Sequence, residues 1–361
     1  MGATKDLHDA GQSIWLDNIT RDAVNDGTIK RYVDELSLTG LTSNPTIFDQ
    51  ALAKGDAYDE QTSELLEQGK RGEELFFELA LTDLRGACDL FAETHRRTSG
   101  VDGWASLEVS PLLARDTQRT TEEAARLHGA AARENLFIKI PGTPEGLDSI
   151  EETIYAGVPV NVTLLFDAAQ YRAQAEAYMR GIERRIADGL DPEIGSVASL
   201  FISRWDVAIA EEDIPDELKN RLGSAEAIAG YVAYRELIDS DRWLRLANEG
   251  ARPQRFLFAS TGTKDPSLPK TKYVQELAAP LSVNTMPEDT LLALAEDEGI
   301  GDLLPADGGD NAELLAEFEA AGIDLDALAL RLQNEGADKF VKSWNELIDR
   351  IDEKSKAVAA G

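Results

Sequence analysis

Eight short apolar segments, each followed by a helical stretch, limit most strongly what this chain can fold into. Strand–helix alternation implies parallel strands joined by right-handed crossovers. Eight such units within 361 residues favour a closed (β/α)8 TIM barrel of the α/β class over an open doubly wound sheet. The predicted strands are Ser13–Asp17, Leu38–Asn44, Ala105–Ser110, Leu136–Ile140, Pro159–Thr163, Val197–Phe201, Phe256–Ser260 and Leu281–Thr285.

Helical patterns fill the segments between the strands and continue after the last one. Examples are Glu73–Arg97, Asp167–Asp188 and Ala225–Asn248. We expect residues 1–361 to form a single barrel domain, with residues 287–361 supplying the last barrel helices and an appended helical cover. After a Gly-rich surface loop at Pro305–Asp310, the tail helices are predicted at Asn311–Ala321, Leu325–Gln333 and Lys339–Val358.

Polar residues recur on one face of the strands, near their carboxyl ends. Buried parallel strands are normally close to continuously hydrophobic, and strand side chains alternate between two faces. Ile138 and Ile140 suit the face beneath the helices, so Lys139 would point into the barrel. Active sites of these barrels form at the carboxyl ends of the strands, so we predict one there. The same alternation groups Asp17 with Trp15, Thr42 with Asn44, Ser106 with Glu108 and Ser110, Asn161 with Thr163, and Ser260 with Phe258.

Other kinds of catalytic site find little support. His8, His95 and His128 fall outside the strand ends, where we expect surface positions, so no metal site is predicted. Cys88 lies in the middle of a predicted helix and is expected in the core. No GxxxxGK[ST] or GxGxxG segment follows a strand, so no nucleotide site is predicted.

A lysine inside a barrel has a specific chemical use. Desolvation favours the neutral amine that attacks a ketone. The protonated imine then withdraws electrons, so that a neighbouring C–C bond can break without any cofactor. The reaction needs one group to take a hydroxyl proton and another to serve the water of imine formation, and Asp17 and Glu108 fit these tasks. The competing interpretation is a structural ion pair between Lys139 and one carboxylate, but buried pairs stabilise poorly.

The charge balance limits the possible partners. The chain has 67 acidic and 36 basic residues, for a net charge of −31. This argues against nucleic acid as a partner and is typical of a solubilising surface. No apolar run approaches the roughly 20 residues of a membrane span, and Met1–Gln12 has no apolar signal segment. One cysteine permits no internal disulfide. We therefore expect a cytoplasmic protein with no membrane association, and leave monomer and homodimer open.

Five segments carry a resemblance to a known family: Ile14–Asp17, Gly40–Phe48, Ser106–Val109, Leu136–Thr143 and Val160–Phe166. Together they resemble transaldolase in its longer bacterial form, and the similarity extends over roughly residues 10–285. The resemblance implies transfer of a dihydroxyacetone unit through a lysine Schiff base in the pentose phosphate pathway. Sedoheptulose 7-phosphate and fructose 6-phosphate would be the ketose donors. Glyceraldehyde 3-phosphate and erythrose 4-phosphate would be the aldose acceptors.

The resemblance also implies a role for each matching residue. Lys139 would form the imine and Asp17 would act on the C4 hydroxyl. Glu108 would activate the catalytic water, and Thr163 would hold that water. The substrate-binding set would be Asn44 and Asn161 for the dihydroxyacetone hydroxyls, Thr42 beside Asn44, Ser199 for a further hydroxyl, and Arg204 for the phosphate.

One departure from the family pattern affects the phosphate site. Ordinary transaldolases carry an arginine shortly after the seventh strand, whereas this chain has Gly262 at that position. Lys264 would then supply the positive charge, and Ser260 a further hydrogen bond. Two alternatives to transaldolase stay open. One is a lyase resembling fructose 6-phosphate aldolase, against which Glu108 speaks, and the other is a non-catalytic barrel that binds sugar phosphates.

Overall fold

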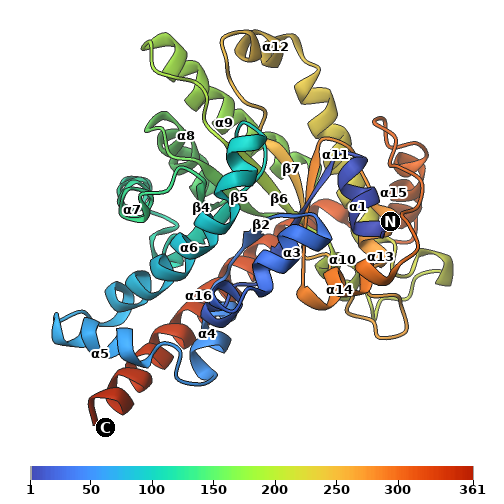
Figure 1. Ribbon diagram of the computed structural model, residues 1–361. Coiled ribbons are helices and arrows are strands. Elements are labelled where there is room, and N and C mark those ends of the chain that lie inside the picture. Colours follow the sequence, from blue (N-terminus) through green and yellow to red (C-terminus); the bar gives the residue numbers. More distant parts are fainter. Residues whose placement is uncertain (1, 361) are drawn as a thin grey trace.

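The structure is a computed structural model that describes residues 2–360 and the side chains of residues 2–358. Eight parallel strands form one sheet in the order β2-β1-β8-β7-β6-β5-β4-β3, and the helices surround it (Figure 1). All eight predicted strands are present with ends within two residues of the predicted ones, which confirms the (β/α)8 barrel. Their bounds are β1 Gln12–Asp17, β2 Leu38–Thr42, β3 Ala105–Glu108, β4 Leu136–Pro141, β5 Val160–Leu165, β6 Ser196–Phe201, β7 Arg255–Ala259 and β8 Ser282–Met286.

The α-helices follow the strands in chain order and extend beyond the last of them. Up to β5 they are α1 Ala3–Asp9, α2 Arg21–Asn25, α3 Thr28–Leu36, α4 Pro45–Ala53, α5 Asp59–Glu67, α6 Gly72–Arg97, α7 Thr117–Ala131 and α8 Leu147–Tyr155. The remainder are α9 Ala168–Ala187, α10 Ser203–Ala208, α11 Leu222–Ile238, α12 Asp241–Asn248, α13 Lys272–Glu276, α14 Glu288–Glu296, α15 Asn311–Ala320 and α16 Leu325–Ala360. No helix in this described part of the chain is long and apolar enough to cross a membrane.

The ring closes where β2 meets β3. A single parallel bridge joins Gly40 to Trp104, and the Leu41 N–H donates to the Trp104 carbonyl at 2.9 Å. A Cβ on Gly40 would lie 2.7 Å both from that carbonyl oxygen and from the Trp15 ring. Glycine is therefore required here, because any side chain would force the two strands apart.

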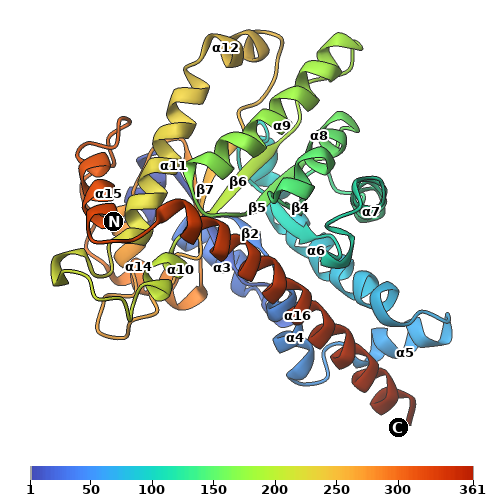
Figure 2. The same cartoon turned by 180° about the vertical axis from the view of Figure 1, so that it is seen from behind.

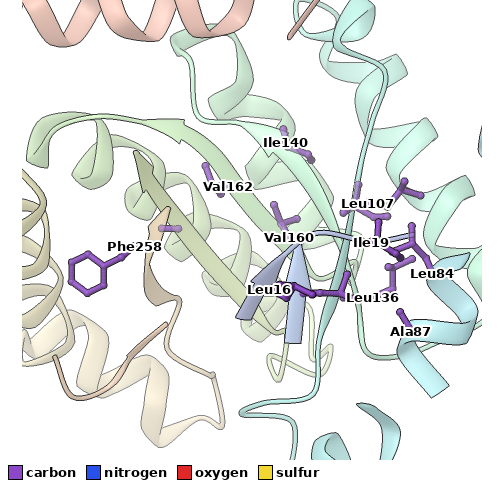
Figure 3. Packing of buried hydrophobic residues seen from close by; sticks show 14 of the residues in the cluster. Leu16, Ile19, Leu84, Ala87, Leu107, Leu136, Ile140, Val160, Val162 and Phe258 are labelled. Atoms are coloured by element: carbon purple, nitrogen blue, oxygen red, sulfur yellow. The ribbon is translucent and has the colours of Figure 1, made fainter. Parts of the chain in front are cut away.

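The alternation of strand side chains divides the core into two parts. Outward residues such as Ile140, Val160 and Val162 pack beneath the helices, in the same cluster as Leu84 and Ala87 of α6 (Figure 3). Inward residues form a second cluster that fills the barrel, and it includes Trp15, Phe137, Val197, Leu257 and Val283. The predicted inward direction of Lys139, next to Phe137 in parity, is confirmed by this division.

The alternation fails at two positions just beyond strand ends. Phe258 packs outward against Tyr231 of α11, with ring centroids 6.1 Å apart, so it does not share a face with Ser260. Ser260 lies just after the end of β7 and has a φ of 57°, so the two-residue alternation of strand side chains no longer holds there. Ser110 likewise lies beyond β3 and donates to Glu73 of α6 at 2.9 Å, away from the barrel interior.

The predicted tail was wrong in one respect: a single helix, α16, replaces the two predicted helices. It crosses the barrel and continues along α4 and α5 to the C-terminus (Figure 2). Buried Gln333 fixes its first part, because its Nε2 donates to the carbonyls of Leu164 at 3.0 Å and Gly142 at 3.2 Å. The Trp344 indole donates to Glu73 at 2.6 Å and fixes the middle. These contacts keep the helix intact through Gly336, where the sequence suggested a break.

Three smaller predictions also need correction or confirmation. The predicted helix Ala225–Asn248 is two helices, since Ser240 begins α12 by accepting a hydrogen bond from the Trp243 N–H at 3.2 Å. His95 and His128 are partly buried rather than at the surface, and His95 lies edge-on to Trp104 at 4.6 Å. Cys88 is buried in α6, as predicted, and burial raises the pKa of its thiol to about 12.

Candidate active site

A pocket of about 460 Å³ opens at the carboxyl ends of the strands. It is lined by nine of the eleven residues that the sequence singled out: Asp17, Thr42, Asn44, Lys139, Thr163, Ser199, Arg204, Ser260 and Lys264. Parallel strands bring these ends together, although the residues are spread over almost 250 positions of the chain. The other two, Glu108 and Asn161, lie beneath the pocket wall.

Lys139 forms part of the buried floor of this pocket. Its side chain is 7% exposed, and Nζ donates to the Ser43 carbonyl at 2.9 Å. The Glu108 carboxylate lies on the neighbouring strand, with Oε1 2.5 Å from Nζ. The amine is thus held by two oxygens and faces the cavity, in position to meet the carbonyl carbon of a ligand.

Glu108 is suited to proton transfer. Neither of its oxygens accepts a hydrogen bond from any described group apart from the ion-pair contact with Lys139. Burial raises the pKa of this carboxyl, and the adjacent Lys139 ammonium opposes part of that change. A carboxyl whose protonated form is favoured in this way can act as a general acid and, once ionised, as a general base.

Asp17 lines the same pocket, at the end of β1. The Thr42 hydroxyl donates to Asp17 Oδ1 at 2.8 Å and also contacts the Thr285 hydroxyl at 2.8 Å. This chain fixes the orientation of the carboxylate. Thr285 on β8 is a pocket residue that was not predicted. Alternation within the predicted eighth strand would place it on the same face as Val283, which points inward.

Thr163 and Asn44 each have a side-chain polar group in the pocket that no protein hydrogen bond uses. The Thr163 hydroxyl is buried and has no protein partner among the described residues. It comes just before a bulge in β5, where Leu164 takes a φ of 63°. Asn44 uses Oδ1 to cap α4, accepting from the Ile47 N–H at 3.0 Å, which leaves its amide nitrogen to bind a ligand.

Asn161 does not reach the pocket. It is fully buried, its Nδ2 donates to the Ser106 hydroxyl at 3.2 Å, and its Oδ1 accepts from the Ser199 hydroxyl at 2.7 Å. Asn161 therefore has no exposed surface in the pocket with which to make the predicted direct contact with substrate. Asn161 instead orients Ser199, which does line the pocket.

Arg204 and Lys264, the two cations predicted to bind the phosphate, both line the pocket. Arg204 lies over the Phe201 ring at 4.9 Å, and its Nη1 is buried without a hydrogen-bond partner among the described residues. Burial lowers the pKa of this guanidinium, and the charge of the Glu335 carboxylate opposes only part of that change. The exposed Lys264 places Nζ 3.9 Å from the point where a Cβ on Gly262 would lie. Its ammonium therefore lies close to where a side chain at position 262 would begin.

Helix α16 forms part of the pocket wall, a contact that the expected helical cover of residues 287–361 did not specify. It contributes Lys339, Phe340 and Ser343, while Thr46 and Gln50 come from α4. A Cβ on Gly336 would approach Arg204 Nη1 to 3.1 Å, so this glycine lets the helix lie directly against the guanidinium. The helical pattern led us to expect a cover over the barrel, but nothing in it indicated which side chains of that helix would line the pocket.

Comparisons with known proteins agree with this geometry. The profile of the family described as Transaldolase/Fructose-6-phosphate aldolase matches residues 14–351. A protein named transaldolase from Renibacterium salmoninarum is 44% identical over 99% of this chain and 97% of its own length. Transaldolases from Saccharopolyspora erythraea and Thermobifida fusca are 45% and 44% identical, with at least 96% of each chain covered. A full-length match at this identity shows that the chain belongs to the transaldolase/fructose-6-phosphate aldolase family.

Proposed function

We propose that this protein is a transaldolase that moves a dihydroxyacetone unit from a ketose phosphate to an aldose phosphate through a Schiff base on Lys139. The observation that carries the proposal is the buried Lys139 amine at the pocket floor, 2.5 Å from Glu108 and facing the pocket that Asp17 also lines. The names of the relatives support the same activity. The substrates would be small sugar phosphates, in a cytoplasmic pentose phosphate pathway, and no cofactor is needed.

The proposed reaction begins when the neutral Lys139 amine attacks the ketose C2 carbonyl. Glu108 protonates the departing hydroxyl, so that water leaves and the imine forms. Asp17 takes the proton of the C4 hydroxyl, the C3–C4 bond breaks, and its electrons move into the imine. The aldose phosphate departs and an enamine stays on the lysine. Attack of this enamine on a second aldose phosphate, followed by hydrolysis with water held at Thr163, completes the transfer.

The buried Arg204 Nη1 group, which has no hydrogen-bond partner among the described residues, supports a phosphate site in the pocket. We place the phosphate between Arg204, Lys264 and Lys339, with Ser260 as an additional donor. Beside Arg204, the two lysines would then take the place of the arginine that ordinary family members carry shortly after the seventh strand. The long α16 contact with α4, α5 and α6 supports the view that residues 1–361 act as one domain with a helical cover.

Charge removal tests this phosphate site. Lys264→Gln and Lys339→Gln should each raise the KM for erythrose 4-phosphate about tenfold and change kcat little, because a charged hydrogen bond is worth about 1.5 kcal/mol. Lys342→Gln is the matched control, since Lys342 is exposed on the same helix and does not line the pocket. An equal effect in the control would show that general surface charge, not a site, determines KM.

The central experiment is chemical trapping of the imine. The protein is incubated with fructose 6-phosphate, reduced with borohydride and digested, and the peptides are analysed by mass spectrometry. We expect the dihydroxyacetone adduct on the peptide that contains Lys139. Acceptor-dependent turnover without any adduct on Lys139 would refute the Schiff-base mechanism, and the absence of both would favour a non-catalytic barrel.

The second candidate is a lyase that releases free dihydroxyacetone. Glu108 beside Lys139 favours transfer over this reaction, on the family pattern described above. A coupled assay of glyceraldehyde 3-phosphate release with and without erythrose 4-phosphate separates the two. Release that is equally fast without the acceptor would replace the transferase proposal by the lyase.

A further inference from the structure

A second cavity, of about 440 Å³, lies at the opposite end of the barrel. It shares no lining residue with the active-site pocket. Its walls come from the amino ends of several strands and from the loops that enter them: Ser13 of β1, Phe137 of β4, Val197 of β6 and Arg255 of β7 are among the residues. Nothing in the proposed reaction uses this cavity.

The inner wall of this amino-end cavity is apolar and rigid. Trp104 and Phe137 are stacked, with centroids 3.9 Å apart and ring planes 17° apart. Gly195 allows the backbone to approach this pair, since a Cβ there would lie 2.7 Å from the Trp104 ring. The entrance is apolar too, because Val101 and Leu281 line it and are 50% and 52% exposed. Exposed side chains of this size gathered around one opening are typical of a binding site.

Charge around the amino-end cavity is opposite to that of the whole protein. Three arginines line it, Arg97, Arg252 and Arg255, with Asp102 as the sole carboxylate in its lining. Arg255 donates hydrogen bonds to Asp102, Ser13 and two carbonyls, and Arg252 pairs with Glu193. Arg97 makes no ion pair or side-chain hydrogen bond within residues 2–358. On a chain of net charge −31, one cation thus remains available beside an apolar cavity.

We propose that the amino-end cavity binds a small carboxylate with an apolar body, such as an aromatic or short-chain aliphatic acid. The apolar body would lie against Trp104, Phe137 and Val197, and the carboxylate would meet Arg97 at the entrance. Cavities of 300–1,000 Å³ with mostly apolar walls and a few polar groups are the usual form of small-molecule sites. The strongly polar sugar phosphates of the active site do not fit these walls.

Isothermal titration calorimetry of the full chain tests this site with 2-naphthoate, octanoate and the neutral 2-naphthamide. We expect at least one carboxylate to bind, and 2-naphthamide to bind about tenfold more weakly than 2-naphthoate if the aromatic acid is the ligand. Octanoate alone would identify the aliphatic class. Saturating fructose 6-phosphate should leave the affinity unchanged, because the two cavities are separate.

Two variants locate the bound molecule. Arg97→Gln should weaken carboxylate binding about tenfold, whereas Arg96→Gln, its exposed neighbour paired with Glu93, should not change it. Val101→Trp should close the entrance and abolish binding, with acceptor-dependent turnover unchanged as proof of folding. The proposal fails if no carboxylate binds, if the Arg96 and Arg97 variants behave alike, or if fructose 6-phosphate displaces the ligand.

Discussion

The two ends of the barrel are built from the same eight strands but differ in how an arginine that each contains is hydrogen-bonded. At the carboxyl end, the Thr163 hydroxyl and Arg204 Nη1 are buried without partners, and Glu108 has only Lys139. At the amino end, the Arg255 guanidinium donates four hydrogen bonds, to two carbonyls, Ser13 and Asp102. Unpaired buried polar groups cost free energy of folding. The carboxyl end therefore gives up stability for chemistry, and Arg255 at the amino end supplies stability.

The largest expected effect is loss of catalysis without loss of stability at the carboxyl end. Lys139→Met should lower kcat by about 10⁵-fold or more, because no other group can form the imine. The free energy of unfolding should not fall, since the Glu108 carboxyl, whose pKa burial already raises, can take up a proton once its partner is gone. Coupled assays and urea denaturation measure the two quantities. Substantial residual turnover would place the nucleophile elsewhere.

Asp17→Ala tests whether the two carboxylates have separate tasks. Cleavage should slow by about 10²–10⁴-fold, the usual contribution of a general acid or base. Borohydride trapping on Lys139 should persist, because imine formation is assigned to Glu108. If trapping is lost together with cleavage, then Asp17 takes part in imine formation and the division of tasks is wrong.

Arg255→Met tests the opposite end of the comparison. Removing one partner of the buried Arg255–Asp102 pair should lower the free energy of unfolding by about 3 kcal/mol, while kcat stays within about twofold. Exposed Arg331→Met, which removes the same charge elsewhere, is the control and should be nearly neutral. A large fall in kcat with little destabilisation would mean that the two ends are not divided as described.

Thr163→Val makes the smallest and most specific change. Replacing an unpaired buried hydroxyl by a methyl group of similar shape should raise the free energy of unfolding by about 1 kcal/mol. The turnover number should fall about tenfold, because the proposed water loses a partner. Thr153→Val is a matched control: Thr153 is also buried with an unpaired hydroxyl but lies on α8. It should stabilise equally and leave turnover unchanged.

The barrel and the catalytic centre could be predicted because they follow from the two-residue period of the strands. Lys139, Asp17, Thr42 and Thr163 all lie within strands, and each faces inward as the alternation requires. The rule stops where the strand stops, which explains the wrong grouping of Ser260. The two-residue period shows which face of a strand a side chain takes, but not whether that side chain reaches the pocket. The burial of Asn161 beneath Ser199 therefore could not be predicted.

A helical cover was expected, but the α16 side chains that line the pocket and the amino-end cavity could not be predicted, since both depend on contacts between distant segments. Lys339 lies 200 positions after Lys139, and its place is fixed by the bonds from Gln333 to the ends of β4 and β5. Helical periodicity shows which face of α16 is apolar but not which part of the barrel it covers. Likewise, Val101 and Arg97 have no pattern that links them to Val197.

The position of α16 at the end of the chain also sets the order in which the enzyme matures. Synthesis delivers the N-terminus first, so all eight strands, complete at Met286, precede the helix that walls the pocket. On the proposed mechanism, a nascent chain would thus carry Lys139 in a pocket without its α16 wall, where water could reach the enamine before any acceptor arrives. Proteolytic clipping within α16 would return the finished protein to that state, in which the proposed transferase would release free dihydroxyacetone and act as a lyase.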